Sequence, residues 1–385
     1  MILPKMILKN AFRRKVRTGL TILAMGIAIL AFGLLRTVLS AWYAGVDASS
    51  ATRLVTRNSV SLIFPLPLSY LDKIRHASGV RQVSYGNWFG GIYISEKNFF
   101  ANFAVEPKSY LELYPEFVLP EAQKADFLRD RRGFVAGKKL AERFGWHTGD
   151  IVTLKGTIYP GDWDFVLRGI YTGRTQTVDE TQFFFHWDYL NETLKKRYPS
   201  MADQVGFYMI GVADPHVSAD VAREVDAMFA NSRAETLTET EKAFVLGFIS
   251  MTEAIVMVIK IVSLVIIVII MAVVANTMAM TTRERTGEYA VLKTLGYSGL
   301  QIGTLITGEA LVITLSGCLL GIAMTYPAAR FFTTSLGAYF PIFFVEPFTV
   351  VLDLGAALLV GLVAAVIPIR QALVIRIADG LRRIG

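Results

Sequence analysis

The run IVSLVIIVIIMAVVANTMAM, residues 261–280, is followed closely by TRERTGEYAVLKTLGYS, residues 282–298. The first stretch has no charged residue in 20 positions, and about 20 apolar residues are what a helix needs to cross the hydrocarbon core of a membrane. The second stretch is short and rich in charge. The sequence therefore predicts a membrane-spanning helix that ends in a compact polar loop.

Three further apolar runs extend this pattern to an integral membrane α-helical protein with four transmembrane helices. The spans are expected at residues 19–43, 244–281, 299–327 and 348–369, the second including a stalk and the third ending at Pro327. Each run has to be helical because lipid offers no hydrogen bonds to an open backbone. Asp353 and Lys260 are expected near the outer interface, where they can reach water or lipid headgroups. The other segments are a basic helix at 1–18, a large extracytoplasmic mixed α/β domain inserted between helices 1 and 2 at 44–243, a coupling helix at 282–298, an external loop at 328–347 and a tail at 370–385.

The overall composition excludes two classes of protein. Apolar residues make up 53% of the chain and charged residues 18%, which is the opposite of the balance found in disordered chains. The single cysteine, Cys318, has no partner for an intrachain disulfide. A cleaved signal peptide is an alternative for the first apolar run, but that run is longer than usual and no small-residue cleavage site follows it.

The charge distribution predicts the orientation in the membrane. Residues 43–245 hold 23 basic and 25 acidic side chains, whereas the apolar parts hold 16 basic and 7 acidic ones. Most of these 16 precede span one, lie between spans two and three, or follow span four. Because Lys and Arg are retained on the cytoplasmic side, both termini are expected in the cytoplasm of a multi-pass membrane protein. A nucleic-acid binder is not favoured, since the α/β block is not basic.

The block between spans one and two has the pattern of a mixed α/β domain. Apolar spacing and turn residues predict helices at 67–77, 138–144 and 218–229, and strands around 80–105 and at 150–154, 165–171 and 205–212. Residues 243–259 are expected to continue as a helix into span two without a break.

The loop of residues 282–298 has a self-contained helical pattern that Gly296 is placed to end. An interfacial helix on lipid headgroups and a docking helix for a cytoplasmic partner both fit this pattern. Its order ERT-G-E, a hydrophobic triplet and LK-x-LG-x-S resembles the cytoplasmic coupling loop of FtsX/MacB-like ABC transporter permeases of the mechanotransmission type. The segment GFVAGKKLAERFGWHTGDIVTL (residues 133–154) and the tail IPIRQALVIRIADGLRR (residues 367–383) are similar to that family as well.

The resemblance implies a homodimeric permease with a separate cytoplasmic ATPase, which would carry the ATP and Mg while this chain carries no cofactor. A periplasmic adaptor and an outer-membrane protein are further partners to test. The residues expected to couple to the ATPase are Arg283, Glu284, Arg285, Gly287, Glu288, Tyr289, Leu292, Lys293, Leu295 and Gly296.

Small residues in the spans suggest close helix packing, because they let helix backbones approach one another in lipid. Both intrachain packing and a dimer seam fit them; they are Gly19, Gly26, Gly33, Gly317, Gly321 and Gly361. Glu309 lies within span three, where an ionisable group usually faces protein or water. An interhelical hydrogen-bond anchor is the first interpretation of Glu309, and a proton relay is the alternative.

No catalytic constellation stands out in the sequence. Residues 133–139 have one residue too few between their glycines for a phosphate-binding loop and lack the Ser or Thr after the lysine. The four histidines have no metal-site spacing, and a nucleophile elbow is missing, so we expect neither an enzyme nor a metal site. Three functions remain: an exporter permease, a lipoprotein-releasing permease of the same superfamily, and a signal transmitter controlling a cell-wall hydrolase.

Overall fold

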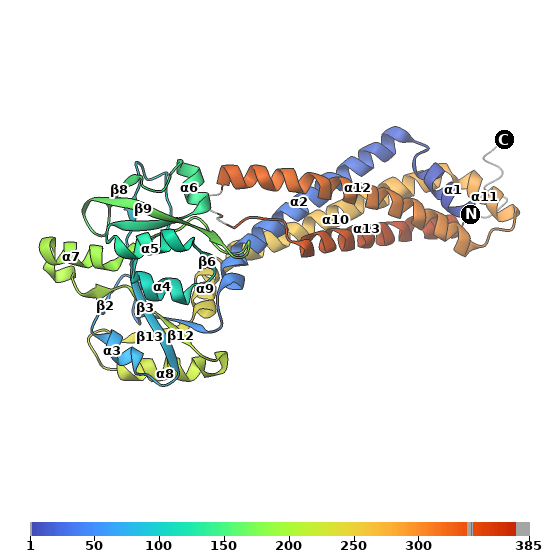
Figure 1. The fold of residues 1–385 in the computed structure, drawn as a ribbon. Helices are drawn as coiled ribbons and strands as arrows, with labels where there is room; N and C mark the ends of the chain where they lie inside the picture. Colours follow the sequence, from blue (N-terminus) through green and yellow to red (C-terminus); the bar gives the residue numbers. More distant parts are fainter. Residues whose placement is uncertain (1, 337–339, 341, 375–385) are drawn as a thin grey trace. The chain divides into compact units, whose positions relative to one another are not determined.

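The computed structural model describes residues 2–336, 340 and 342–374, which form two compact units (Figure 1). The membrane unit comprises residues 1–41, 252–336 and 343–385, and the sheet unit comprises residues 42–251 and 337–342. The predictions for residues 375–385, which include most of the basic tail, lie outside the described residues. Along the chain, the sheet unit falls between the first and second long helices.

The membrane unit is built from four long helices with two short ones near one end (Figure 1). Within the described chain, these four are the helices long and apolar enough to cross a membrane. The long helices are α2 (Lys15–Ala48), α10 (Glu253–Glu284), α12 (Gly299–Leu336) and α13 (Pro347–Val374), and the short ones are α1 (Ile2–Ala11) and α11 (Thr286–Thr294).

Glycines mark the points where the long helices approach most closely. A Cβ added at Gly317 would lie 2.5 Å from the Cβ of Met25, and one added at Gly321 would lie 2.7 Å from the carbonyl oxygen of Gly26. Helices α2 and α12 therefore meet almost backbone to backbone, as small residues permit in lipid. Gly361 packs α13 in the same way against Leu311 of α12.

Two helix ends differ from the prediction. Helix α12 does not stop at Pro327 but continues through it to Leu336, so part of the expected external loop is helical. A proline can remain inside a membrane helix when neighbouring groups re-satisfy the freed carbonyl. The basic segment also is not one helix, because α1 ends at Ala11 and α2 begins at Lys15 after a short turn.

The helix expected to run unbroken into span two is interrupted. Helix α9 ends at Ser250 and α10 begins at Glu253, with Thr252 at φ −111° and ψ 14°, outside the helical region. The Ser250 hydroxyl donates to the Gly247 carbonyl at 2.7 Å, a local bond of the kind that competes with the regular helix ladder. The predicted continuous stalk is therefore wrong.

The sheet unit contains, among the described residues, a mixed sheet of eleven strands in the order β13-β1-β12-β3-β5-β10-β7-β9-β8-β4, with β6 beside β9. The pairs β10–β5 and β7–β9 are parallel, and the other neighbours are antiparallel. The strands are β1 (Arg53–Asn58), β2 (Leu66–Pro67), β3 (Val80–Trp88), β4 (Gly91–Ile92), β5 (Asn102–Val105), β6 (Phe117–Val118), β7 (Gly133–Gly137), β8 (Ile151–Gly156), β9 (Gly161–Gly173), β10 (Phe183–His186), β11 (Gln204–Val205), β12 (Phe207–Val212) and β13 (Thr236–Thr240).

Helices cover both faces of this sheet, which explains why its central strands are apolar on both sides. In β10, Phe183 and Phe185 enter one core while Phe184 enters the other, following the two-residue period of a strand. The first core also receives α3 (Tyr70–Arg75), α6 (Lys138–Phe144), α7 (Trp187–Arg197) and α8 (Ser218–Met228), and the second receives α4 (Pro107–Leu113) and α5 (Glu121–Arg129). The unit ends in α9 (Glu241–Ser250).

Most predicted elements of the sheet unit are present with shifted ends. The helix at residues 138–144 has the predicted bounds, and the closing helix ends one residue early, at Met228. The helix predicted at residues 67–77 is shorter because Leu66–Pro67 form β2, paired with β11, and only Tyr70–Arg75 are helical. The prediction of four candidate membrane helices and a mixed α/β domain is confirmed.

Candidate functional site

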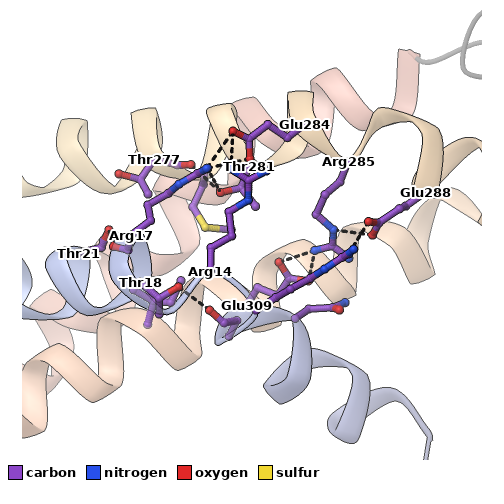
Figure 2. Close-up of a pocket in the computed structure, with 15 residues that line it drawn as sticks. Arg14, Arg17, Thr18, Thr21, Thr277, Thr281, Glu284, Arg285, Glu288 and Glu309 are labelled. Atoms are coloured by element: carbon purple, nitrogen blue, oxygen red, sulfur yellow. Dashed lines mark hydrogen bonds and ion pairs between the residues drawn. The ribbon is translucent and has the colours of Figure 1, made fainter. Parts of the chain in front are cut away.

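One end of the membrane unit holds a cluster of charged side chains that come from segments far apart in the sequence (Figure 2). We call this cluster the charged corner. Its members are Arg13, Arg14, Arg17, Glu284, Arg285, Glu288 and Glu309. They lie in the α1–α2 turn and at the start of α2, at the α10–α11 junction, and on α12.

The α1–α2 turn places three arginines at the corner. The Thr18 hydroxyl donates to the Ala11 carbonyl at 2.6 Å, which satisfies an acceptor at the end of α1 and fixes the turn. Arg13 and Arg14 lie in this turn, and Arg17 lies in the first turn of α2. Arg14 and Arg17 point toward the α10–α11 junction (Figure 2), and Arg13 reaches Glu288 just beyond it.

Glu284, the last residue of α10, binds two of these arginines. Arg17 donates to both of its carboxylate oxygens, at 2.8 and 2.9 Å, and Arg14 donates to one of them at 3.1 Å. Arg17 also reaches the Thr281 hydroxyl, one turn earlier on α10, at 3.2 Å. The bidentate pair fixes the start of α2 against the end of α10, because the planar guanidinium restricts geometry as well as charge.

Arg285, between α10 and α11, connects the junction to α12. One of its terminal nitrogens donates to both oxygens of Glu309, at 2.7 and 2.9 Å, and its Nε donates to Glu288 at 2.9 Å. Burial opposes the charge on Arg285, but Tyr289 and Glu309 outweigh that cost, and its pKa lies above the ordinary value. The guanidinium carbon lies 5.3 Å from the centre of the Tyr289 ring, within the range of a cation–π interaction.

Glu288 completes the corner from the first turn of α11. It accepts hydrogen bonds from Arg285 and from Arg13. Partial burial acts to raise its pKa, but these two guanidinium groups outweigh it and hold the pKa below the usual range. Glu288 is therefore a stable anion that ties α11 to the α1–α2 turn.

A cavity of about 200 Å³ lies among these side chains (Figure 2). The hydroxyls of Thr18, Thr21, Thr277 and Thr281 line it together with the charged groups. Each hydroxyl donates to a backbone carbonyl of a preceding residue. The cavity has no built metal site: among the described residues, no three His, Cys, Asp or Glu side chains gather as metal ligands would.

Helix α11 has a packed side and an open side. Tyr289 and Ala290 are buried and Leu292 is partly buried against the membrane core, whereas Val291 and Leu295 are 39% and 71% exposed. The helix ends at Leu295 followed by Gly296 at φ +88°, where the Gly296 amide donates to Lys293 and the Tyr297 amide to Leu292. This is the C-terminal motif for which glycine is favoured.

The other residues predicted to couple to the ATPase differ in their exposure and in their contacts. Arg283 is exposed at the end of α10, and Gly287 is half-buried in the first turn of α11. The Lys293 ammonium donates to the Leu373 carbonyl at 2.9 Å, which ties α11 to the end of α13. Glu284, Arg285 and Glu288 face the charged corner, so their contacts are with this chain.

The glycines on α2 also separate into different environments. Gly26 faces Gly317 and Leu320 of α12, and Gly33 faces α12 and α13. A Cβ at Gly19 would meet nothing within 4 Å. Intrachain packing thus accounts for Gly26 and Gly33 but not for Gly19.

Two features escaped the sequence analysis. Val291 is exposed one turn before Leu295, and the i, i+4 spacing of these apolar residues was the available signal. Arg53, at the start of β1, has 8% of its side chain exposed and pairs with Glu116 at 2.7 Å and Glu241 at 2.8 Å. No local pattern could reveal this second cluster, because its members lie up to 188 positions apart.

The expectation that Asp353 reaches water is wrong. It is 1% exposed on α13, and a Cβ added at Gly33 of α2 would lie 3.3 Å from its Oδ2. Depth along the span predicted an interface position for Asp353, but neighbouring helices cover it.

Comparison with known proteins identifies the membrane unit. Residues 260–376 match the family model described as FtsX-like permease C-terminal. This range includes α11, its junction with α10, and helices α12 and α13. The chain therefore carries the membrane region of an FtsX-like permease, and its resemblance to FtsX-like ABC transporter permeases is confirmed. Residues 260–376 thus indicate an ABC transporter permease subunit of that type.

Two solved structures are similar to part of the chain. The extracellular domain of the noncanonic ABC-type transporter YknZ from Gram-positive bacteria has 12% identity, covers 49% of this chain and 100% of its own, and has a TM-score of 0.36. A domain described as that of a putative permease protein from Porphyromonas gingivalis has 11% identity, covers 50% of this chain and 92% of its own, and has a TM-score of 0.34. None of the curated proteins matches the chain.

Proposed function

We propose that this chain couples ATP hydrolysis by a separate cytoplasmic ATPase to a conformational change of its membrane helices, and that the sheet unit uses this change in export. The ATPase carries ATP and Mg, and this chain supplies the dock and the moving helices. The observation that carries the proposal is the two-sided helix α11, which is rooted in the membrane core through Tyr289 and exposes Val291 and Leu295.

The exposed side of α11 suits a protein partner. Val291 and Leu295 lie one turn apart on the same face, and Arg283, near the end of the preceding helix, is exposed as well. Protein–protein interfaces usually have an apolar core that is surrounded by a polar rim. Leu292, by contrast, packs inward, so its proposed contribution is to hold α11 in place.

The charged corner supplies the connection between the dock and the long helices. A movement of α11 would be transmitted to α12 through the contact of Arg285 with Glu309. It would be transmitted to the start of α2 through the contact of Glu288 with Arg13. Paired and partly buried side chains resist separation because a single unpaired charge left behind is costly. The helices would therefore move with α11 as a connected group.

The proposal places the protein in a bacterial inner membrane. Basic residues are frequent in and around α1 and α11, which supports a cytoplasmic position for that end of the unit. The sheet unit is then extracytoplasmic, as an insertion between the first two spans, and the working form is a homodimer. A periplasmic adaptor and an outer-membrane protein would complete an export path.

Co-purification of the full chain in mild detergent tests the docking step. Leu295→Glu and Val291→Glu should lower ATPase recovery by about tenfold or more, since each would place a charge in an apolar contact, and tenfold corresponds to about 1.4 kcal/mol. Ile151→Glu is the matched control, because Ile151 is an equally exposed apolar residue in the sheet unit, at 68%. Full ATPase recovery with both α11 variants, or none with the unmodified chain, would contradict the proposal.

The same preparation distinguishes the possible substrates. An adaptor or outer-membrane companion supports export. A lipoprotein or its chaperone in its place would indicate lipoprotein release, and a cell-wall hydrolase would indicate signalling. Either of these last two outcomes would overturn export while leaving the ATPase dock intact.

A further inference from the structure

A second intramembrane acid lies apart from the charged corner and has a different environment. Asp353, in the second turn of α13, is 1% exposed, and its Oδ1 has no hydrogen-bond partner within the protein. Among the described residues, no ion pair includes Asp353, whereas Glu309 is held by Arg285. The two buried acids of the membrane unit are therefore not equivalent.

Three helices meet at Asp353. A Cβ added at Gly33 of α2 would lie 3.3 Å from Asp353 Oδ2 and 3.2 Å from the hydroxyl oxygen of Thr325 on α12. A larger residue at position 33 would occupy the space into which the carboxyl group extends. The glycine thus permits the acid to reach the boundary between α2, α12 and α13.

The Thr325 hydroxyl, which lies beside the same position of Gly33, has no proton to offer this carboxyl group. It donates to the Gly321 carbonyl at 2.9 Å, and because a hydroxyl has one proton and two lone pairs, it is left as an acceptor. The Thr349 hydroxyl, one turn before Asp353 on α13, is buried without a partner within the protein and can take either role. A carboxylic acid has a proton to donate to an acceptor such as Thr325, whereas a carboxylate has none.

The physical cost of the charged form leads to the same conclusion. An isolated carboxylate in a low-dielectric interior is strongly unfavourable, and such a group normally takes up a proton instead. We propose that Asp353 is a proton-binding site and that it holds its proton in the conformation described here. The Thr325 hydroxyl, which lies beside the same position of Gly33 as the carboxyl group, is the acceptor assigned to this proton.

Arg36 is the group placed to receive the ionised form. It follows Gly33 by three residues, so it lies on the same face of α2 one turn away, and its Nε is buried with no partner within the protein. Its long side chain can reach across one turn by changing rotamer. When α2 and α13 separate, water can enter, Asp353 can release its proton, and Arg36 can pair with the carboxylate.

Other titratable groups in this part of the membrane unit are few. Helix α12 contributes the buried Cys318 and the exposed Arg330, α10 contributes the exposed Lys260, and Glu346 precedes α13. No ion pair joins any of these to Asp353 within the described residues. We therefore assign Arg36 as the cation that pairs with the Asp353 carboxylate after the proton is released.

Infrared spectroscopy of the full chain in lipid tests the protonation state directly. The unmodified protein near neutral pH should show the C=O stretching band of a protonated carboxyl group in an apolar site. Asp353→Asn should remove that band. Glu309→Gln is the matched control and should leave the band in place, since Glu309 is paired with Arg285.

Failure to see the band, or a band that survives in Asp353→Asn, would overturn the proposal. Carbodiimide labelling provides a second measurement that needs no substitution, because these reagents attack protonated carboxyl groups. Labelling mapped to the peptide that contains Asp353, decreasing as pH rises, is expected. Unlabelled Asp353 under conditions that label another buried acid would contradict the assignment.

The contribution of Arg36 has a separate test. Arg36→Gln should shift the midpoint of the infrared or labelling titration to higher pH, because it removes the positive charge that would stabilise the carboxylate. An unchanged midpoint would overturn the role of Arg36. Both readouts measure proton binding and do not involve the ATPase, so they remain separate from the test of the proposed transport function.

Discussion

A single terminal nitrogen of Arg285 hydrogen-bonds both carboxylate oxygens of Glu309, at 2.7 and 2.9 Å. This contact is the arrangement expected of an interhelical anchor, with a charged group as the partner, and the role of Glu309 stays a prediction. The pair joins the α10–α11 junction to α12, two elements that the proposed coupling has to move together.

Replacing Arg285 should lower the free energy of unfolding more than replacing Glu309 does. Arg285→Ala leaves a carboxylate buried without its partner and should lower the free energy of unfolding by about 3–5 kcal/mol. Glu309→Gln can still accept one hydrogen bond, while Arg285 keeps Glu288, so a loss of about 1–3 kcal/mol and retention of most function are expected. Thermal unfolding of both variants and of the double variant gives the coupling energy. Complete loss of function in a well-folded Glu309→Gln protein would restore the proton-relay interpretation.

The glycines of the membrane unit provide a test of packing. Gly321→Ala should lower the free energy of unfolding by about 1–3 kcal/mol, because its Cβ would lie 2.7 Å from the Gly26 carbonyl oxygen. Gly19→Ala on α2 should cost nothing within the protomer, since no atom lies within 4 Å of the added Cβ. Melting temperatures in detergent would show the difference. If Gly19→Ala instead weakens self-association, Gly19 belongs to a dimer seam.

The Arg53 cluster should be a main source of stability in the sheet unit. Arg53 pairs with Glu241 at 2.8 Å, and Glu241 also accepts from the Tyr114 hydroxyl at 3.0 Å. Arg53→Met should cost about 3–5 kcal/mol, since it leaves Glu241 and Glu116 without their cation. The exposed pair of Arg223 with Asp220 is the control, and Arg223→Met should change stability by less than about 1 kcal/mol. Equal effects from the two substitutions would refute the assignment.

Tryptophan fluorescence can follow that unfolding in the full chain. All five tryptophans, Trp42, Trp88, Trp146, Trp163 and Trp187, belong to the sheet unit. A denaturant titration read in this way reports on the sheet unit while the chain remains intact.

His186 should make the stability of the sheet unit depend on pH. Burial lowers its pKa below the ordinary value of 6.5, and the hydrogen bond at 2.6 Å between its Nε2 and the Phe127 carbonyl only partly opposes this. The unfolded chain then binds a proton more readily than the folded one. Stability should be complete above pH 6.5 and should fall as the pH decreases toward the lower folded value. His186→Gln should flatten this part of the fluorescence-detected profile, and an unchanged slope would exclude His186 as its cause.

The membrane-spanning helices could be predicted because each depends on a local run of apolar residues. A run such as residues 261–280 has no alternative to a membrane helix, since each apolar residue and each backbone group imposes the same requirement. The end of α11 was readable as well, because Gly296 takes up a left-handed conformation that favours glycine. Helix ends were less predictable: Pro327 lies inside α12, and α9 and α10 are separate helices, because neighbouring contacts decide whether a helix continues.

The sequence by itself therefore determined the four spans, the mixed α/β composition of the inserted block and the family resemblance of the α10–α11 junction. Tertiary structure decided what each charged residue contacts. Arg13, Arg14 and Arg17 read as orientation signals, yet they bind Glu284 and Glu288 more than 260 positions away. Asp353 read as an interfacial residue, yet it is enclosed by α2 and α12. Pairing and burial depend on which helices become neighbours, and that is set by packing over the whole chain and not by any local pattern.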